Sequence, residues 1–227
     1  MKTILKSILL AGAALTLASG ARAASIVYNF GLIADTAALT TGDLGLTATY
    51  TVSGLSITAS AFGPALSGAA DHLYGKNLGA GETGLGMTND PTGQHEIYFG
   101  QGFVQLDLNA LVGKISPNSV YAAFNSTTGG EQWTIYGSNT AGVLGGATLP
   151  ASKTVIASGT NVQGVDTLLT GGFRYYDFVS TASAGGKNVL LKSLTVVPEP
   201  GTWALMITGF GGVGLMARRR RAMALQA

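Results

Sequence analysis

Short runs of alternating apolar and polar residues fill the chain between about residues 24 and 197. The alternation is clearest in FVQLDLNAL. In an extended run, Val104, Leu106 and Leu108 point one way while Gln105 and Asp107 point the other. This spacing predicts a β-strand with one face toward a core.

The same period recurs in EQWTIYGSN, which places Trp133 and Ile135 on one face. Turn residues such as Asn89-Asp90-Pro91 separate the runs, and β-branched and aromatic side chains are frequent within them. Only Leu108–Val112 suggests a short helix between the two ends of the chain. The predicted strands are Ser25–Phe30, Leu46–Val52, Leu55–Phe62, Glu96–Phe99, Phe103–Leu108, Val120–Asn125, Gln132–Tyr136, Lys153–Ala157, Phe173–Val179 and Val189–Val196.

Many short strands at regular spacing are typical of an all-β fold made of two packed sheets. No charged or proline-rich linker divides residues 24–197. We therefore expect one β-sandwich domain over 24–197, with jelly-roll-like connections as the simplest arrangement.

The N-terminus has the three parts of a secretory signal peptide. Lys2 and Lys6 supply positive charge, Ile8–Ala18 is apolar, and Ala21-Arg22-Ala23 ends in the small residues that signal peptidase reads. We expect cleavage after Ala23, so that residues 1–23 are absent from the exported protein.

The C-terminus changes abruptly at two prolines, Pro198 and Pro200, which end the last strand. Residues 200–217 carry no charge and would span about 27 Å as a helix, close to the thickness of a bilayer core. They predict a transmembrane helix. By the positive-inside rule, the following arginines stay cytoplasmic with the tail 222–227, as a stop-transfer end, and leave the domain outside. This cluster consists of Arg218, Arg219, Arg220 and Arg221.

Together, these C-terminal residues resemble the PEP-CTERM sorting signal in its PEPxxWA form. The motif residues are Pro198, Glu199, Pro200, Trp203 and Ala204, followed by the apolar helix and the arginines. The resemblance implies a Gram-negative host that makes exopolysaccharide. It also implies recognition of Pro198, Glu199 and Pro200 by exosortase, a membrane enzyme that releases the protein from its anchor. The precursor would be anchored in the inner membrane with its body in the periplasm, before reaching the cell surface or exterior. A plain membrane anchor without processing is the alternative.

The net charge of the exported body differs from that of the chain. The whole chain carries +2, but residues 24–198 hold six basic and ten acidic residues, a net charge of −4. This balance argues against a nucleic-acid partner, which needs a basic surface. The absence of cysteine excludes thiol catalysis, thiolate metal sites and disulfides.

Polar and charged residues cluster between positions 71 and 96: Asp71, His72, Glu82, Asn89, Asp90, His95 and Glu96. No zinc-binding motif such as HExxH is present. Oxygen ligands suit calcium, so Glu82, Asn89 and Asp90 form a candidate calcium site. The alternative is structural, because Asn89-Asp90-Pro91 is also typical of a simple turn.

The sequence does not predict an enzyme. Facing carboxylates such as Glu96 with Asp107, or Glu82 with Glu131, have no distinctive spacing, and no GxSxG nucleophile motif occurs. GAGETGLG lacks the lysine of a phosphate-binding loop.

Sugar binding through aromatic rings is a further hypothesis. Trp133 and Tyr136 are the candidate stacking residues, although a tryptophan alternating with Ile135 is also typical of a core. The other available rings are Tyr74, Tyr98, Tyr175 and Tyr176.

Two functions follow. The first is a non-catalytic surface or matrix protein of an exopolysaccharide layer or biofilm. The second is a carbohydrate-binding module of the β-sandwich type. An exposed flat strip of the named rings favours the module, and rings buried between two sheets favour the structural protein.

The segment LYGKNLGAGETGLGMTNDPTGQHEIYFGQGFVQLDL, with WTIYGSNTAG after it, also resembles glycine-rich β-domains found with this signal.

Overall fold

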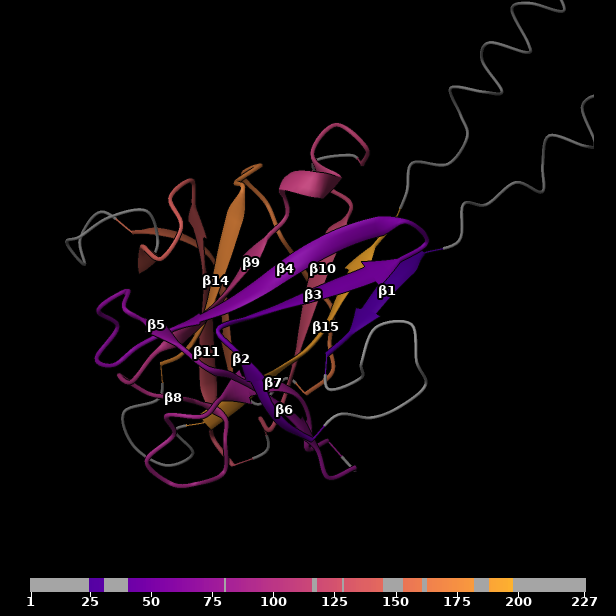
Figure 1. Ribbon diagram of the computed structural model, residues 1–227. Coiled ribbons are helices and arrows are strands. Elements are labelled where there is room, and N and C mark those ends of the chain that lie inside the picture. The colour runs from indigo at the N-terminus through magenta and orange to yellow at the C-terminus, as the bar shows by residue number, and fades with distance from the viewer. Residues whose placement is uncertain are drawn as a thin grey trace, which may run out of the picture. The chain divides into compact units, whose positions relative to one another are not determined.

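The computed structural model describes residues 25–30, 41–79, 81–115, 118–127, 129–144, 153–160, 163–181 and 188–197 (Figure 1). Residues 25–197 form one compact unit, which contains all the elements below. The predicted signal peptide (1–23), sorting signal (198–221) and tail (222–227) lie outside the described residues.

The described strands form two antiparallel sheets that pack face to face, which confirms the predicted all-β sandwich. The eight-stranded sheet contains β1 (Ile26–Asn29), β2 (Gly42–Gly45), β6 (Leu73–Asn77), β7 (Thr83–Met87), β8 (Ile97–Tyr98), β10 (Val120–Asn125), β13 (Thr167–Leu168) and β15 (Asn188–Val196). The seven-stranded sheet contains β3 (Thr47–Val52), β4 (Leu55–Phe62), β5 (Ala70–Asp71), β9 (Phe103–Asp107), β11 (Gln132–Ser138), β12 (Thr154–Thr160) and β14 (Tyr175–Ser180). The jelly-roll connectivity stays a prediction.

The strand β15 lies at the centre of the eight-stranded sheet. It pairs with β10 along one edge, and with β1, β7 and β8 along the other. Its side chains are almost all buried, as expected for a strand enclosed by neighbours on both edges. The order of the main path is β13-β10-β15-β7-β6-β2.

The seven-stranded sheet has the order β12-β11-β14-β9-β4-β3, with β5 added beside β4. In Figure 1, β3 and β4 run side by side as one long hairpin. Along β4, Ile57, Ala59 and Ala61 point inward and are buried, so the alternation seen in the sequence becomes one face of the core.

The core lies between the two sheets. It joins side chains of the eight-stranded sheet, such as Leu85 and Leu191, to side chains of the seven-stranded sheet, such as Leu106 and Phe178. All four are completely buried. Burial of this apolar surface is the main stabilising contribution to such a sandwich.

The opposite face of β9 is covered as well, which the alternation did not predict. Gln105 is 2% exposed, donates to the carboxylate of Asp177 at 2.7 Å and accepts from the amide of Gly142 at 3.0 Å. Beside it, Phe103, Val179 and Leu144 form a second apolar cluster outside the main core. The loop after β11 therefore covers this part of the sheet.

Five strands were not predicted: β2, β5, β6, β7 and β13. The hairpin β6–β7 has the sequences LYGKN and TGLGM, in which glycine weakens the strand pattern. The predicted short helix at Leu108–Val112 is a single turn of 3₁₀ helix, η1 (Asn109–Leu111).

Candidate functional site

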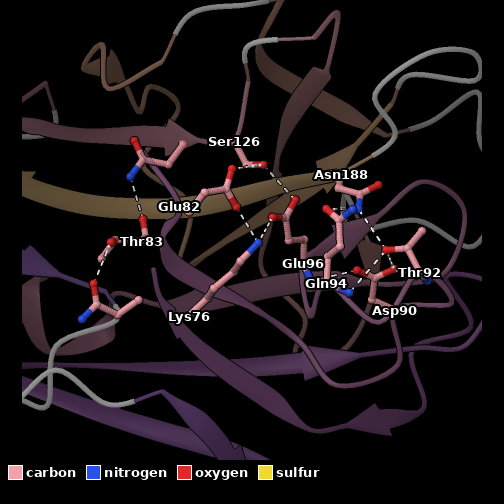
Figure 2. A network of polar contacts seen from close by, with 11 residues as sticks. Lys76, Glu82, Thr83, Asp90, Thr92, Gln94, Glu96, Ser126 and Asn188 are labelled. Atoms are coloured by element: carbon pink, nitrogen blue, oxygen red, sulfur yellow. Dashed lines mark hydrogen bonds and ion pairs between the residues drawn. The ribbon is translucent and has the colours of Figure 1, made fainter. Parts of the chain in front are cut away.

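A lysine and two glutamates meet at one end of the hairpin β6–β7 (Figure 2). Lys76 lies on β6 opposite Gly84 of β7, and Glu82 immediately precedes β7. The turn closes through the backbone: the Leu78 amide donates to the carbonyl of Glu82, and the Glu82 amide donates to that of Gly79. The hairpin itself thus brings Lys76 and Glu82 together.

The second glutamate, Glu96, comes from the loop between β7 and β8. Asp90 organises this loop: its Oδ1 accepts from the amide and hydroxyl of Thr92 at 2.8 and 2.7 Å, and its Oδ2 accepts from the amide of Glu96 at 3.1 Å. An aspartate that binds backbone amides ahead of it is a common turn device. The result is a fixed backbone position for Glu96.

Close packing against Gly86 completes the placement of Glu96. A Cβ atom at Gly86 would lie 2.1 Å from the carbonyl oxygen of His95 and 2.8 Å from the Cα of Glu96. Only glycine permits this approach of the loop to β7. His95 itself has φ of 60°, an uncommon conformation for a residue other than glycine.

The three charged groups are in direct contact. The Lys76 ammonium donates to Oε2 of Glu82 at 2.5 Å and also to Oε1 of Glu96. The hydroxyl of Ser126, just after β10, lies 2.9 Å from Oε2 of Glu96 and 3.2 Å from Oε1 of Glu82, as Figure 2 shows. With one proton, this hydroxyl donates to one glutamate at a time.

Burial differs between the two glutamates. The side chains of Lys76 and Glu96 are 7% and 0% exposed, whereas that of Glu82 is 42% exposed. Lys76 and Glu96 therefore form a buried ion pair, in which desolvation opposes the attraction between the charges.

The pKa values follow from this burial. Burial raises the pKa of Glu96 to about 7, although Lys76 opposes the shift. Burial also acts to raise the pKa of Glu82. The hydrogen bonds that Glu82 makes, the one from Lys76 above all, outweigh burial and lower that pKa. Burial alone would lower the pKa of Lys76, yet its two carboxylate partners raise it. With Glu96 protonated, the cluster of Lys76, Glu82 and Glu96 has no net charge.

An open cavity of about 430 Å³ borders this cluster. Its lining includes Lys76 and Glu82 together with Tyr74, Gln94 and His95. The rings of Tyr74 and His95 stack with centroids 4.0 Å apart. Thr41, Leu78 and Gly93 complete the lining. The cavity gives solvent a path to the exposed carboxylate of Glu82.

A second cavity, of about 190 Å³, is apolar and lies beside η1. Leu108, Leu111, Val120 and Leu169 line it together with Tyr176, whose hydroxyl donates to the carbonyl oxygen of Thr170 at 3.0 Å.

The predicted calcium ligands do not converge. Glu82 faces Lys76 and Ser126, whereas both carboxylate oxygens of Asp90 accept hydrogen bonds from its own loop. Within the described parts of the chain, no group of three histidine, cysteine, aspartate or glutamate residues could hold a metal ion. The calcium hypothesis for Glu82, Asn89 and Asp90 stays a prediction, and both carboxylate oxygens of Asp90 already accept hydrogen bonds within the turn.

The two histidines lie in different surroundings. Nδ1 of His72 lies 2.8 Å from the carboxylate of Asp43, at an exposed position. Nδ1 of His95 is buried and has no hydrogen-bond partner among the described residues. The segment 71–96 thus supplies the lysine–glutamate cluster of Lys76, Glu82 and Glu96.

The structure corrects the hypothesis that Trp133 stacks on sugars. Trp133 is 3% exposed and stacks on Phe124 with ring centroids 4.5 Å apart. The remaining candidates include Tyr175 and Tyr176, which are 8% and 3% exposed. Tyr136 is half-buried beside the second apolar cluster, with the Lys153 ammonium 5.8 Å from its ring centroid. The named rings therefore do not form one exposed strip.

The nominated carboxylate pairs also have other partners. Asp107 binds the guanidinium of Arg174 through both oxygens, at 2.7 and 3.2 Å. Glu131 accepts from the amide of Gly129. Asp107 and Glu131 thus each have a partner of their own, on Arg174 and on the backbone of Gly129.

Two members of the cluster, Lys76 and Ser126, were not predicted from the sequence. Lys76 is a cation inside an apolar and glycine-rich strand, which is a signal for a buried ion pair once β6 is recognised. Ser126 follows β10 and lies 30 residues beyond Glu96 in the chain, and nothing in its local sequence links the two.

The comparison with protein families decides the nature of the C-terminus. A family model described as the PEP-CTERM protein-sorting motif matches residues 196–221. The chain carries a PEP-CTERM sorting motif. This confirms the resemblance in the PEPxxWA segment, and the motif indicates export with a membrane-anchored sorting signal and processing by exosortase.

The PEP-CTERM match begins at Val196, the last residue of β15. Pro198, Glu199, Pro200, Trp203, Ala204 and Arg218 to Arg221 all lie outside the described residues. The described segments contain no helix long and apolar enough to cross a membrane, and the helix expected at 200–217 is not among them. No curated protein and no solved structure matches the chain.

Proposed function

We propose that the protein is an exported, non-catalytic component of the cell surface or extracellular matrix, sorted and released by exosortase. The PEP-CTERM motif at residues 196–221 carries this proposal, because such a motif directs export and is recognised by exosortase. Signal peptidase removes residues 1–23 first, and the inner membrane holds the precursor with its body in the periplasm.

The β-sandwich supports the matrix part of the proposal. Rings expected to bind sugars, Trp133 and Tyr176 among them, contribute to the core. The nominated carboxylates are occupied by neighbouring groups. A body of this kind would contribute a stable folded unit to an exopolysaccharide layer or biofilm of a Gram-negative host.

The mass and location of the mature protein in its native host test the sorting step. The wild-type chain is expected outside the cell, ending near Pro200. Glu199→Ala is expected to stay in the membrane with Arg218–Arg221 retained, because recognition needs the acidic residue between the prolines. Thr202→Ala, at a variable position of PEPxxWA, is the matched control and should be released normally. Retention of the arginines by all three chains would mean a plain anchor.

Carbohydrate binding is the second candidate function, in the open cavity beside Lys76 and Glu82 and not at Trp133. The open cavity of about 430 Å³ has a half-buried tyrosine, Tyr74, and a side-chain amide, Gln94. Aromatic faces and amides are the groups that bind sugar rings and their hydroxyls. Binding of the host's own exopolysaccharide should weaken in Gln94→Ala and remain unchanged in Tyr121→Ala. Equal binding by both variants would exclude this cavity.

A further inference from the structure

The contact between Lys76 and Glu96 places an amine against a carboxyl group inside the fold. Their side chains are 7% and 0% exposed, and the ammonium donates directly to Oε1 of Glu96. Two opposite charges buried together are held at a desolvation cost. Condensation of the two groups would replace the buried amine and carboxyl group by one neutral amide.

We propose that Lys76 and Glu96 form an intramolecular amide bond after the domain folds, with Glu82 accepting the proton that the lysine must lose. The bond would join β6 to the loop before β8. This inference is independent of the sorting function, since it concerns only residues of the β-sandwich.

The geometry holds both reacting groups in place. The Ser126 hydroxyl lies 2.9 Å from Oε2 of Glu96, the oxygen not bound by Lys76. Asp90 fixes the Glu96 backbone through its amide, and Gly86 allows that backbone to lie against β7. Such fixed proximity turns a slow bimolecular condensation into an intramolecular reaction.

The protonation states suit the reaction. A carboxyl group accepts an amine only when it is protonated, and burial raises the pKa of Glu96 to about 7. The pKa of Glu82 is lowered by its hydrogen bonds despite burial, so Glu82 is ionised and can act as the base. Its Oε2 lies 2.5 Å from the Lys76 nitrogen.

The step balances without any co-reactant. The Lys76 ammonium gives one proton to Glu82, and the resulting amine attacks Cδ of protonated Glu96. The new C–N bond forms, a second nitrogen proton passes to the Glu96 hydroxyl oxygen, and the C–O bond breaks to release water. The products are an amide, one water molecule and a protonated Glu82, which returns its proton to solvent. The cavity beside Lys76 and Glu82 is the exit path for the water.

Such a bond has a structural role in this chain. The protein has no cysteine and therefore no disulfide to hold its exported domain. The amide would close a loop between positions 20 residues apart, which restricts the unfolded chain as a disulfide does.

Mass spectrometry of the wild-type protein, recovered from its host and fully denatured, tests the proposal directly. Its body is expected to be lighter than its sequence by one water molecule. A protease that does not cleave at lysine should release a branched peptide joining the Lys76 and Glu96 segments. Unlinked Lys76 and Glu96 peptides with the full sequence mass would overturn the proposal, and a branch at Glu82 would overturn the assignment of Glu96.

Two variants test the mechanism. Glu82→Gln keeps the shape of the base but cannot accept a proton, so the linked fraction should fall at least tenfold with both partners present. An unchanged fraction would refute the role of Glu82. Asp107→Asn alters the carboxylate of another ion pair and should leave the link complete. A loss of the link in that control as well would show that the effect of Glu82→Gln is not specific to the base, and would refute the role of Glu82.

Discussion

The effect of Trp133→Ala on the free energy of unfolding distinguishes a core role of this side chain from a sugar-binding role at the surface. Trp133 packs between Phe124, on the neighbouring sheet, and the backbone of β12, where a Cβ at Gly159 would lie 2.4 Å from the indole ring. Because both faces of the ring are covered, Trp133→Ala leaves a cavity inside the sandwich. The free energy of unfolding should therefore fall.

The size of the loss follows from burial. A buried aromatic side chain removes about 150–250 Å² from water. At about 25 cal/mol per Å², this area corresponds to about 4–6 kcal/mol, an upper estimate because the unfolded chain also buries part of it. Measured replacements of buried tryptophan or phenylalanine by alanine cost about 3–5 kcal/mol, and we expect Trp133→Ala to fall in this range.

Urea unfolding of the purified full chain, followed by circular dichroism, measures this loss. Tyr136→Ala is the matched control, since Tyr136 lies on the same strand but is only half-buried, and this change should cost clearly less. A loss below about 1 kcal/mol for Trp133→Ala, the usual range of a surface change, would refute a core position for this ring.

Three further predictions concern the loop, an ion pair and the amide. Gly86→Ala should cost about 2–3 kcal/mol in urea unfolding, because its Cβ meets the His95 carbonyl, while Gly129→Ala, which meets only a flexible side chain, should be nearly neutral. Despite burial, Arg174 lowers the pKa of Asp107, so this pair stabilises the fold above the ordinary value of 3.8 and loses its contribution as pH falls through the lowered pKa. Asp107→Asn should therefore be less stable than wild type at pH 6 and approach it near pH 2 in denaturation curves; a constant difference would contradict the shift. The Lys76–Glu96 amide should form more slowly as pH rises through about 7, where Glu96 ionises, in a mass-spectrometric time course that starts from freshly synthesised, unlinked chain; a rate that rises instead would contradict the role of the protonated acid.

Strands with apolar and polar alternation could be predicted from the sequence. The run Leu55–Phe62 matches β4 at both ends, and Val120–Asn125 matches β10. One face of β4 lies in the core, so burial imposes its period of two, whereas β10 is buried on both faces and is marked by its apolar and aromatic residues. The PEP-CTERM motif was recognisable for another reason: its residues are read in order along the chain and need no fold.

The glycine-rich hairpin β6–β7 could not be predicted, because its glycines serve contacts made by distant segments. Gly84 lies against the backbone of Leu191, and Gly86 against that of His95. The candidate site shares this difficulty, since Lys76, Glu96 and Ser126 meet only through the sheet. From the sequence, Trp133 could be interpreted as a sugar-stacking or as a core residue, and only its contact with Phe124 decides between the two.

The position of β15 has a consequence for transport. This strand is the last part of the sandwich in the chain, ending at Val196, yet it joins β1, β7, β8 and β10 into one sheet. A chain threaded N-terminus first through a secretion channel exposes β15 only after the rest of the domain has crossed. The earlier strands of the eight-stranded sheet then lack the strand that joins them, so the sandwich cannot be complete until transfer is almost complete. Because its central strand comes last in the chain, the eight-stranded sheet can be completed only after the domain has crossed the membrane.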